Sequence, residues 1–346
     1  MTISRGVDKK LFLYMAVIVI ALYGFHSESV SARTLREYDV SLNKQAKTAR
    51  KYVQEGNYEK ALASYGDALS EYEKGKKNKG ALFCLERMGW LQREIGEYGE
   101  ALQLFKKAYP LAKRLNGDAA EIDADLGDVY LFSGDSIKAR QHYEKALTTL
   151  KDFEFETDYS APPGDREIMA MIRKSKAIIH ARVNLGTLYY FEGKYEKALE
   201  NLKIARDLIK KILYVANHEM YGMYFRLDSD IYEGMGFCHT IMGATYGEMG
   251  NFDKAWHQFN VGKKAFQKGK RHYGLLVNQA LRFKIEFLSG KVTKEQARLE
   301  KFESFLKKAD NFGAQDIVWR MCYEIGRAFA REKQNALARQ YLERAI

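Results

Sequence analysis

Most of the chain repeats one pattern of small, aromatic and polar positions. In each of five blocks, a Gly is followed by an Ala five residues later, by a large and mostly aromatic residue nine residues later, and by a small residue twelve residues later. The five blocks begin at Gly56, Gly96, Gly134, Gly193 and Gly250. Steps of four and three residues return to the same face of an α-helix, so each block predicts a helix with one apolar face.

A second helix is predicted upstream of each block. A small residue stands seven positions before each Gly, at Ala49, Gly89, Gly127, Gly186 and Gly243. Small residues allow two helices to touch closely, while an aromatic residue fills the gap between neighbouring pairs. The Gly itself suits the turn where the first helix ends. Each block therefore predicts a helix–turn–helix hairpin.

This pattern resembles the tetratricopeptide repeat family, whose unit is a 34-residue helical hairpin. Two weaker copies follow, one around Gly290 and one from Trp319 through Gly326 to Ala345. The resemblance implies an all-α fold, a right-handed α-α superhelix (a solenoid) of about seven hairpins over residues 41–346. The predicted repeats lie near 42–75, 82–115, 120–153, 179–212, 236–269, 276–309 and 319–346. In this family the concave face, lined by the first helices, is the usual binding surface.

Two connections are longer than the 34-residue period. The first, between Gly134 and Gly193, contains Pro162-Pro163-Gly164, and we expect a loop over 154–165. The second precedes Gly250, and its stretch from 199 to 249 has no Pro and only short polar breaks. We therefore expect lengthened helices in the second connection.

The amino-terminal segment has the layout of a signal peptide. It carries the basic residues Arg5, Lys9 and Lys10, then an uncharged and largely apolar run over 11–27, then Val30-Ser31-Ala32. The apolar core is shorter than the roughly 20 residues that a membrane-spanning helix needs. We therefore predict a signal peptide over 1–32, a short linker over 33–40, and an exported protein that is periplasmic or secreted. The alternative is an uncleaved segment that anchors the chain to a membrane.

Charge and composition narrow the class of partner. The chain is 46% hydrophobic and 29% charged with 3 Pro, which argues against disorder. Its net charge is +11, and the balance is compatible with acidic proteins or an anionic surface. An exported protein meets little nucleic acid, so we expect no nucleic-acid partner. The cluster of Lys74, Lys76, Lys77 and Lys79 is interpreted as a solvated loop.

Motifs for catalysis or metal binding are incomplete. His218-Glu219 begins a zinc-protease motif, but Gly222 stands where the second His belongs. Cys238 and His239 are neighbours on a predicted helix, so their side chains diverge. The three cysteines, Cys84, Cys238 and Cys322, are expected to be buried packing residues. We therefore predict no catalytic residue, no cofactor and no metal site.

The groove positions of the family select seven candidate partner-binding residues. They are Arg50, Trp90, Arg93, Asp128, Thr187, Tyr190 and Arg327. Arg can hold a carboxylate through two hydrogen bonds, and Trp or Tyr offers rigid contact area, so this set suits an acidic, partly aromatic segment. The alternative is that these side chains are solvated or packed within the superhelix. Ala46 and Arg50 replace the Lys and Asn of chaperone-binding members, which argues against that ligand.

The function we expect is an exported scaffold that binds a protein or peptide along its concave face. The alternative is a regulatory arm of a larger enzyme. Residues 319–328 resemble repeats that precede a caspase-like CHAT protease domain, and the chain stops inside a predicted helix without a cap. We therefore expect the natural chain to continue past Ile346. The sequence predicts neither the ligand nor the oligomeric state.

Overall fold

The computed structural model describes residues 42–116, 118–155, 165–216, 229–289, 295–331 and 333–345. These residues form helices and connecting turns, with no strand among them. The predicted signal peptide and the linker over 33–40 lie outside the described residues. Among the described helices, none is both long and apolar enough to cross a membrane.

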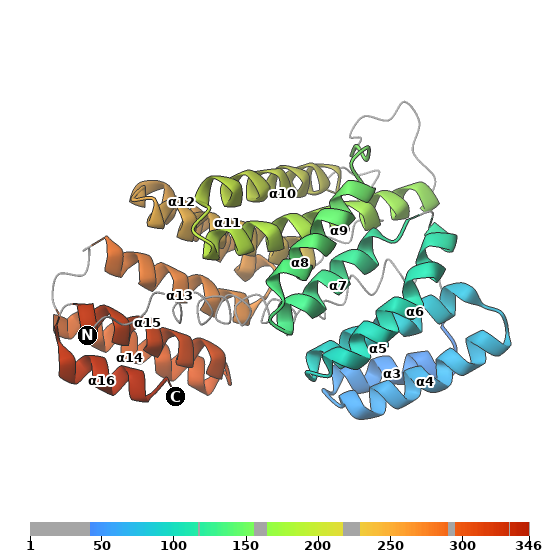
Figure 1. The fold of residues 1–346 in the computed structure, drawn as a ribbon, viewed down its shortest axis with the longest axis horizontal. Helices are drawn as coiled ribbons and strands as arrows, with labels where there is room; N and C mark the ends of the chain where they lie inside the picture. The colour runs from blue at the N-terminus through green and yellow to red at the C-terminus, as the bar shows by residue number, and fades with distance from the viewer. Residues whose placement is uncertain are drawn as a thin grey trace.

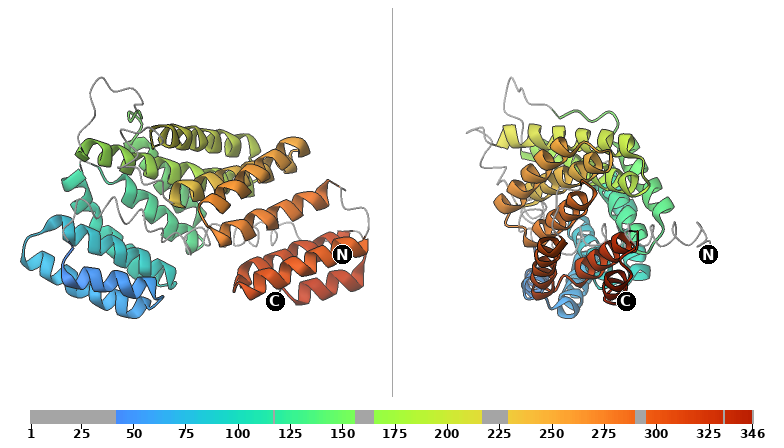
Figure 2. Two further views of the ribbon diagram at one scale, coloured as in Figure 1. Left: turned by 180° about the vertical axis from the view of Figure 1, so that it is seen from behind. Right: turned by 90° about the vertical axis from the view of Figure 1, so that its left-hand side faces the viewer.

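Fourteen helices are described, and consecutive helices run antiparallel to build an arch. They are α3 (Lys44–Gln54), α4 (Tyr58–Lys74), α5 (Asn78–Glu94), α6 (Tyr98–Asn116), α7 (Ala120–Phe132), α8 (Ser136–Thr149), α9 (Asp165–Phe191), α10 (Tyr195–Ala216), α11 (Ser229–Glu248), α12 (Phe252–Lys268), α13 (His272–Leu288), α14 (Glu295–Asn311), α15 (Gln315–Arg331) and α16 (Asn335–Glu343). The first and last hairpins form the two ends of the arch (Figure 1, Figure 2). The predicted all-α superhelix is confirmed.

The hairpin turns follow from the residues around each block's Gly. Gly56 and Gly134 have φ of 72° and 90°, a region that a side chain disfavours. A polar residue follows directly and caps the next helix: Asn57 accepts a hydrogen bond from the Lys60 amide at 3.2 Å, and Asp135 accepts one from the Lys138 amide at 3.0 Å. The same short sequence therefore ends one helix and starts the next.

Small residues hold the two helices of a hairpin close together. A Cβ atom on Gly127 would lie 2.5 Å from the Tyr143 ring, and one on Gly186 would lie 2.6 Å from Leu202 Cγ. These are the small residue seven positions before the turn and the large residue nine positions after it. The spacing found in the sequence is thus the contact between α7 and α8, and between α9 and α10.

The sixth hairpin departs from this packing. Phe283 on α13 occupies the position seven residues before Gly290, where the other repeats carry Gly or Ala. Its ring centroid lies 6.3 Å from that of Phe302 and 5.3 Å from that of Phe305, both on α14. The two helices therefore meet through aromatic side chains. The α14–α16 group stands beside α13 in Figure 1.

The long connections contribute long helices. α9 has 27 residues and begins at Asp165, ahead of the predicted repeat start at residue 179. α10 has 22 residues and α11 has 20, and both belong to the stretch where lengthened helices were expected. The predicted Pro162-Pro163-Gly164 loop falls outside the described residues, as do residues 217–228.

Candidate functional site on the concave face

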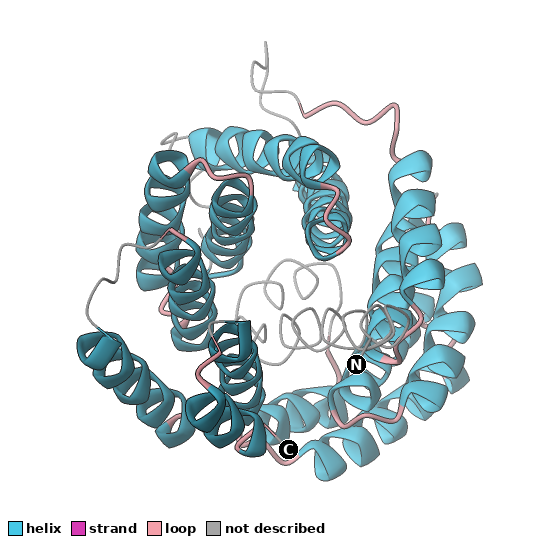
Figure 3. Ribbon diagram, turned by 60° about the vertical axis from the view of Figure 1, so that its left-hand side comes forward, coloured by secondary structure: helices cyan, strands magenta, loops and turns pink. Residues whose placement is uncertain are grey.

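The odd-numbered helices line the concave side of the arch. From α5 onward, each packs against the next odd-numbered helix: α5 with α7, α7 with α9, α9 with α11, α11 with α13, and α13 with α15. Even-numbered helices pack mainly against their odd-numbered neighbours. An array bends toward the side where successive helices are closest, so these contacts place the odd-numbered helices on the inside of the bend. Figure 3 shows the helices wound into a coil. The first helices of the hairpins therefore form the concave face.

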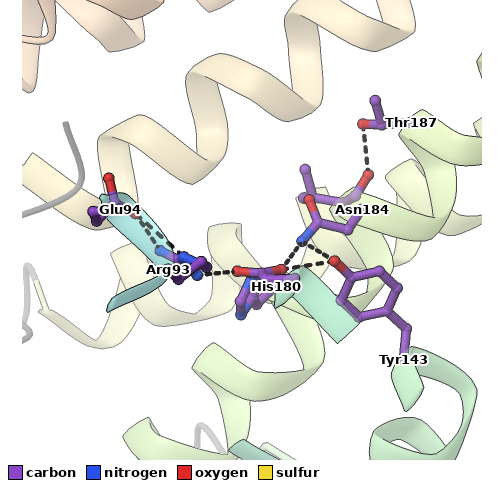
Figure 4. Close-up of polar contacts among 8 residues, drawn as sticks. Arg93, Glu94, Tyr143, His180, Asn184 and Thr187 are labelled. Atoms are coloured by element: carbon purple, nitrogen blue, oxygen red, sulfur yellow. Dashed lines mark hydrogen bonds and ion pairs between the residues drawn. The ribbon is translucent and has the colours of Figure 1, made fainter. Parts of the chain in front are cut away.

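A buried carboxylate, Asp128 on α7, joins three inner helices. Arg93 Nη1 on α5 donates to Asp128 Oδ2 at 2.6 Å, and the Tyr143 hydroxyl donates to Oδ1 at 2.7 Å. From α9, Asn184 Nδ2 donates to Oδ1 at 3.1 Å, and His180 Nε2 lies 3.0 Å and 3.1 Å from the two oxygens. Figure 4 shows these side chains converging from different helices. We call this set the Asp128 cluster.

Charges within the Asp128 cluster stabilise one another. Burial alone would raise the pKa of Asp128, but His180 and Arg93 hold it below its usual value. Burial alone would lower the pKa of His180, but Asp128 holds it above its usual value. Burial raises the pKa of Tyr143 well above its usual range, and Asp128 adds to the effect. Arg93 also donates to Glu94 Oε1 at 2.8 Å through Nη2. Asp128 is therefore an ionised acceptor surrounded by donors.

A second polar group joins α9, α11 and α13. Lys284 Nζ lies 2.6 Å from Glu248 Oε1 and donates to the Tyr190 hydroxyl at 3.3 Å. Burial raises the pKa of Tyr190 to about 12, so its hydroxyl stays protonated at neutral pH. Burial alone would lower the pKa of Lys284, but Tyr190, Glu324 and Glu248 hold it above its usual value. Helix α9 thus takes part in both polar groups.

Three of the seven predicted binding residues keep partly exposed side chains. Arg50 and Trp90 are half-buried on α3 and α5. Arg327 on α15 is also half-buried and lies over the Tyr323 ring at 5.6 Å from its centroid. Tyr323 in turn stacks on Trp319, with ring centroids 6.0 Å apart. These residues belong to opposite ends of the arch.

The other four predicted residues are buried, and their polar groups bond within the protein. Arg93 and Asp128 bond each other, so the structure brings together one pair of the predicted set. The Thr187 hydroxyl donates to the Val183 carbonyl at 2.8 Å, and Tyr190 bonds Lys284. This corresponds to the packed alternative for these four residues. Contact with a ligand stays a prediction for all seven.

Sequence reasoning missed His180, Asn184, Glu248 and Lys284. His180 and Asn184 are four residues apart and share a face of α9, a pattern that could have indicated a polar inner stripe. Their partners lie 52 and 56 residues away in the sequence, beyond the reach of local spacing. Ligand atoms of Asp125, Asp128 and His180 also lie within 4.8 Å of one another. The Arg93 guanidinium already neutralises Asp128 there, which disfavours a metal ion.

Comparison with known proteins agrees with the fold. Family models described as tetratricopeptide repeat match residues 49–114, 124–149 and 320–346. Tetratricopeptide repeats are thus shown in these three stretches, within a chain whose described residues form an all-α superhelix. A comparison with curated proteins found no match.

Several solved structures share the fold. Aspartyl phosphate phosphatase F from Bacillus subtilis is 13% identical, with a TM-score of 0.64 over 87% of this chain and 68% of that one. The apo form of RapI is 11% identical, with a TM-score of 0.60 over 87% and 94%. The Rap conjugation gene regulator of plasmid pLS20, solved with the Phr* peptide, is 17% identical, with a TM-score of 0.57 over 87% and 71%. At these identities the likeness shows the fold.

Proposed function

We propose that this protein is an exported scaffold that binds a protein or peptide segment on its concave face. The observation that carries the proposal is the Asp128 cluster, which fixes α5, α7 and α9 relative to one another. The half-buried ring of His180 belongs to this cluster, and the half-buried Trp90 lies on α5 one turn before Arg93, so both side chains extend from helices whose positions are already fixed. A preorganised surface loses little entropy when a ligand binds.

Two further points support a peptide-like partner. The pLS20 regulator, whose fold is similar, was solved in complex with a peptide. On the present chain, Trp90 and the Trp319–Tyr323 stack offer aromatic contact area. The charge of Arg93 is matched by Glu94 and Asp128, so Arg93 gives no basis for a preference for acidic partners.

Affinity capture followed by binding measurements tests this function. Residues 33–346 serve as bait in the exported fraction, and the captured partner is titrated against variants. We expect Trp90→Ala or Arg327→Ala to weaken binding about tenfold or more, as truncation of a contact hot spot does. Ile137→Ala is the control, since Ile137 is 70% exposed on the even-numbered helix α8. Unchanged affinity in both concave variants would contradict the proposal.

We propose binding rather than catalysis because the cysteine thiols are unsuited to nucleophilic attack. Burial raises the pKa of Cys84 and of Cys238 to about 12, and Cys238 Sγ donates to the Leu202 carbonyl at 2.9 Å. A protonated thiol is a poor nucleophile. Iodoacetamide at neutral pH should therefore label the folded chain slowly, whereas rapid labelling of Cys238 would indicate a reactive thiol.

The export part of the proposal rests on the amino-terminal pattern. Mass spectrometry of cell fractions should find a mature chain that begins near Arg33, outside the cytoplasm. A cytoplasmic chain that retains Met1 would refute it.

The second candidate function is the recognition arm of a larger enzyme such as a CHAT-type cysteine protease. It is favoured by the last repeat, where residues 320–346 match a repeat model and 319–328 resemble repeats that precede such domains. The coding sequence beyond Ile346 tests it. A protease domain there would support this candidate, and an immediate stop codon would remove it.

A further inference from the structure

The even-numbered helices α10 and α12 expose a concentration of basic side chains. Their exposed lysines are Lys203, Lys210 and Lys211 on α10 and Lys263, Lys264 and Lys268 on α12. Within residues 203–214 and 257–270, both described throughout, Asp207 is the one acidic residue. Both helices lie along the top of the arch in Figures 1 and 2. We call the exposed side of these two stretches the basic face.

His239 on α11 shows that the two basic stretches are neighbours. It is 5% exposed, and its Nδ1 lies 2.5 Å from Gln258 Oε1 on α12. Burial lowers the pKa of His239, the hydrogen bond to Gln258 opposes this, and the neighbours Arg206 and Lys210 on α10 and His257 on α12 lower the pKa further. His239 is therefore flanked by both helices, in a region of positive potential.

The second ring nitrogen of His239 lacks a hydrogen-bond partner among the described residues. The oxygen of Gln258 can only accept, so Nδ1 carries the proton and Nε2 is left as an acceptor. Nε2 is buried as well. A neutral His239 ring is consistent with the positive charges of Arg206 and Lys210 beside it. Arg206 pairs with Asp207, so the excess positive charge of the basic face comes from its exposed lysines.

The residue types favour a lipid surface over a protein carboxylate. The exposed cations are lysines, which act as mobile point charges, whereas Arg is the residue suited to fixed carboxylate geometry. Tyr214 is 67% exposed and lies on the same face of α10 as Lys203 and Lys210, eleven and four residues away. An aromatic ring with a polar tip suits the headgroup region of a bilayer. Ile204, 40% exposed, adds apolar surface on the same helix.

We propose that the basic face docks on the headgroups of an anionic phospholipid membrane. The even-numbered helices lie on the other side of the array from the concave face, so a docked protein keeps its groove open to a partner. The predicted export route also brings the chain to a membrane. This inference does not depend on the peptide-binding function, and each can fail alone.

Vesicle flotation of the full chain tests the proposal. Vesicles of phosphatidylcholine alone are compared with vesicles that also contain phosphatidylglycerol, at low and high salt. We expect stronger binding to the anionic vesicles that weakens with salt. A lysine near an anionic surface strengthens membrane partitioning on the order of fivefold, so the variant Lys210→Glu/Lys211→Glu/Lys263→Glu/Lys264→Glu should bind at least about a hundredfold more weakly.

A matched variant controls for net charge. Lys106→Glu/Lys107→Glu/Lys113→Glu/Arg114→Glu makes the same charge change on α6, another even-numbered helix with exposed basic residues. The amino-terminal apolar run is present in every variant, so its contribution to vesicle binding is the same in each and does not affect the comparison. Retained binding in the α6 variant, with loss in the α10–α12 variant, supports the proposal. Equal loss in both variants, or loss in neither, overturns it.

Fluorescence gives a readout that does not rely on the charge reversals. The chain has three tryptophans of its own, so the emission of Tyr214→Trp is compared with that of the parent chain. The difference between the two should shift to shorter wavelength on anionic vesicles and stay unchanged on phosphatidylcholine alone. Inorganic phosphate and a soluble acidic protein are the two comparison probes. If either one binds this face while anionic vesicles do not, the lipid assignment is wrong.

Discussion

Gly186 shows how the absence of one side chain sets the distance between two helices. A Cβ atom there would lie 2.6 Å from Leu202 Cγ and 3.2 Å from the Ala198 carbonyl oxygen. The leucine can change its rotamer, but the carbonyl belongs to the backbone of α10. A larger residue must therefore move the helix.

We predict that Gly186→Leu lowers the free energy of unfolding by about 2 to 4 kcal/mol, the cost of overpacking a tight core contact. Gly89→Leu should lower the free energy of unfolding by an amount near the lower end of that range. The nearest neighbour of a Cβ atom there is the Phe105 ring at 3.0 Å, a side chain that can move more easily than a backbone carbonyl. Urea denaturation measures both. Gly66→Ala in α4 is the control, because nothing lies within 4 Å of its added Cβ, and it should be neutral or stabilising by up to about 1 kcal/mol. Unchanged midpoints for Gly186→Leu would place this glycine outside the contact.

The pH dependence of stability should report on His180. Its pKa is raised in the folded chain by Asp128, with Asp125 adding to the effect and Arg93 opposing it. The raised pKa of His180 contributes to the free energy of unfolding. This contribution is fully present below the ordinary His pKa of about 6.5 and is lost as pH rises through the higher pKa that His180 has in the folded chain. On the acid side, the lowered pKa of Asp128 contributes stability above the ordinary Asp pKa of about 3.9, and this is lost as pH falls through the folded value.

Urea midpoints measured across this pH range test the assignment. In the parent chain the midpoint should fall on the alkaline side, and His180→Gln should remove that part of the slope. An identical alkaline slope in His180→Gln would assign the titration to another group.

At the scale of the helical hairpin, the sequence predicted the structure correctly wherever that structure depends on residues close together in the chain. The turn, the cap and the close helix contact all involve residues within about 16 positions of one another, and a repeat displays that spacing several times. The start of α9 at Asp165 was missed because the repeat was counted back from Gly193 with the 34-residue unit, which places its first residue at 179. The polar contacts between odd-numbered helices were missed because their partners lie 35 to 94 positions apart and carry no local pattern.

The sixth hairpin offers a test of aromatic packing between helices. Phe283 is 5% exposed and contacts Phe302 and Phe305. We predict that Phe283→Ala costs about 3 to 5 kcal/mol, since it leaves a cavity between α13 and α14. Hydrogen exchange should then become faster in α14 than in α5.

A matched change at an exposed aromatic residue serves as the control. Phe312 is 40% exposed near the turn between α14 and α15, so Phe312→Ala should have a much smaller effect. Equal effects of the two substitutions would contradict a core role for Phe283.

At the scale of the whole molecule, the Asp128 cluster fixes the geometry of three successive hairpins. Asp128→Asn removes the negative charge that Arg93 and His180 share, and breaking a buried ion pair costs about 3 to 5 kcal/mol. We predict a lower melting temperature and a larger radius of gyration in solution scattering, with helical content unchanged by circular dichroism.

Asp207→Asn provides the comparison at the surface, because Asp207 is 57% exposed and pairs with Arg206 next to it. It should leave both the melting temperature and the radius of gyration close to those of the parent chain. A parent-like radius for Asp128→Asn as well would show that the cluster stabilises the array without setting its curvature.

Helix α9 also has a consequence for the order in which the chain folds. Ile179 and Val183 belong to the large apolar cluster of the carboxy-terminal half, whereas Ala181 and Leu185 belong to the cluster shared with α7 and α8. In a simple repeat array, folding can nucleate at any hairpin and spread outward. Here neither half completes its core until α9 is helical. Formation of the middle of the array should therefore limit the rate of refolding. The two ends then add last and unfold first.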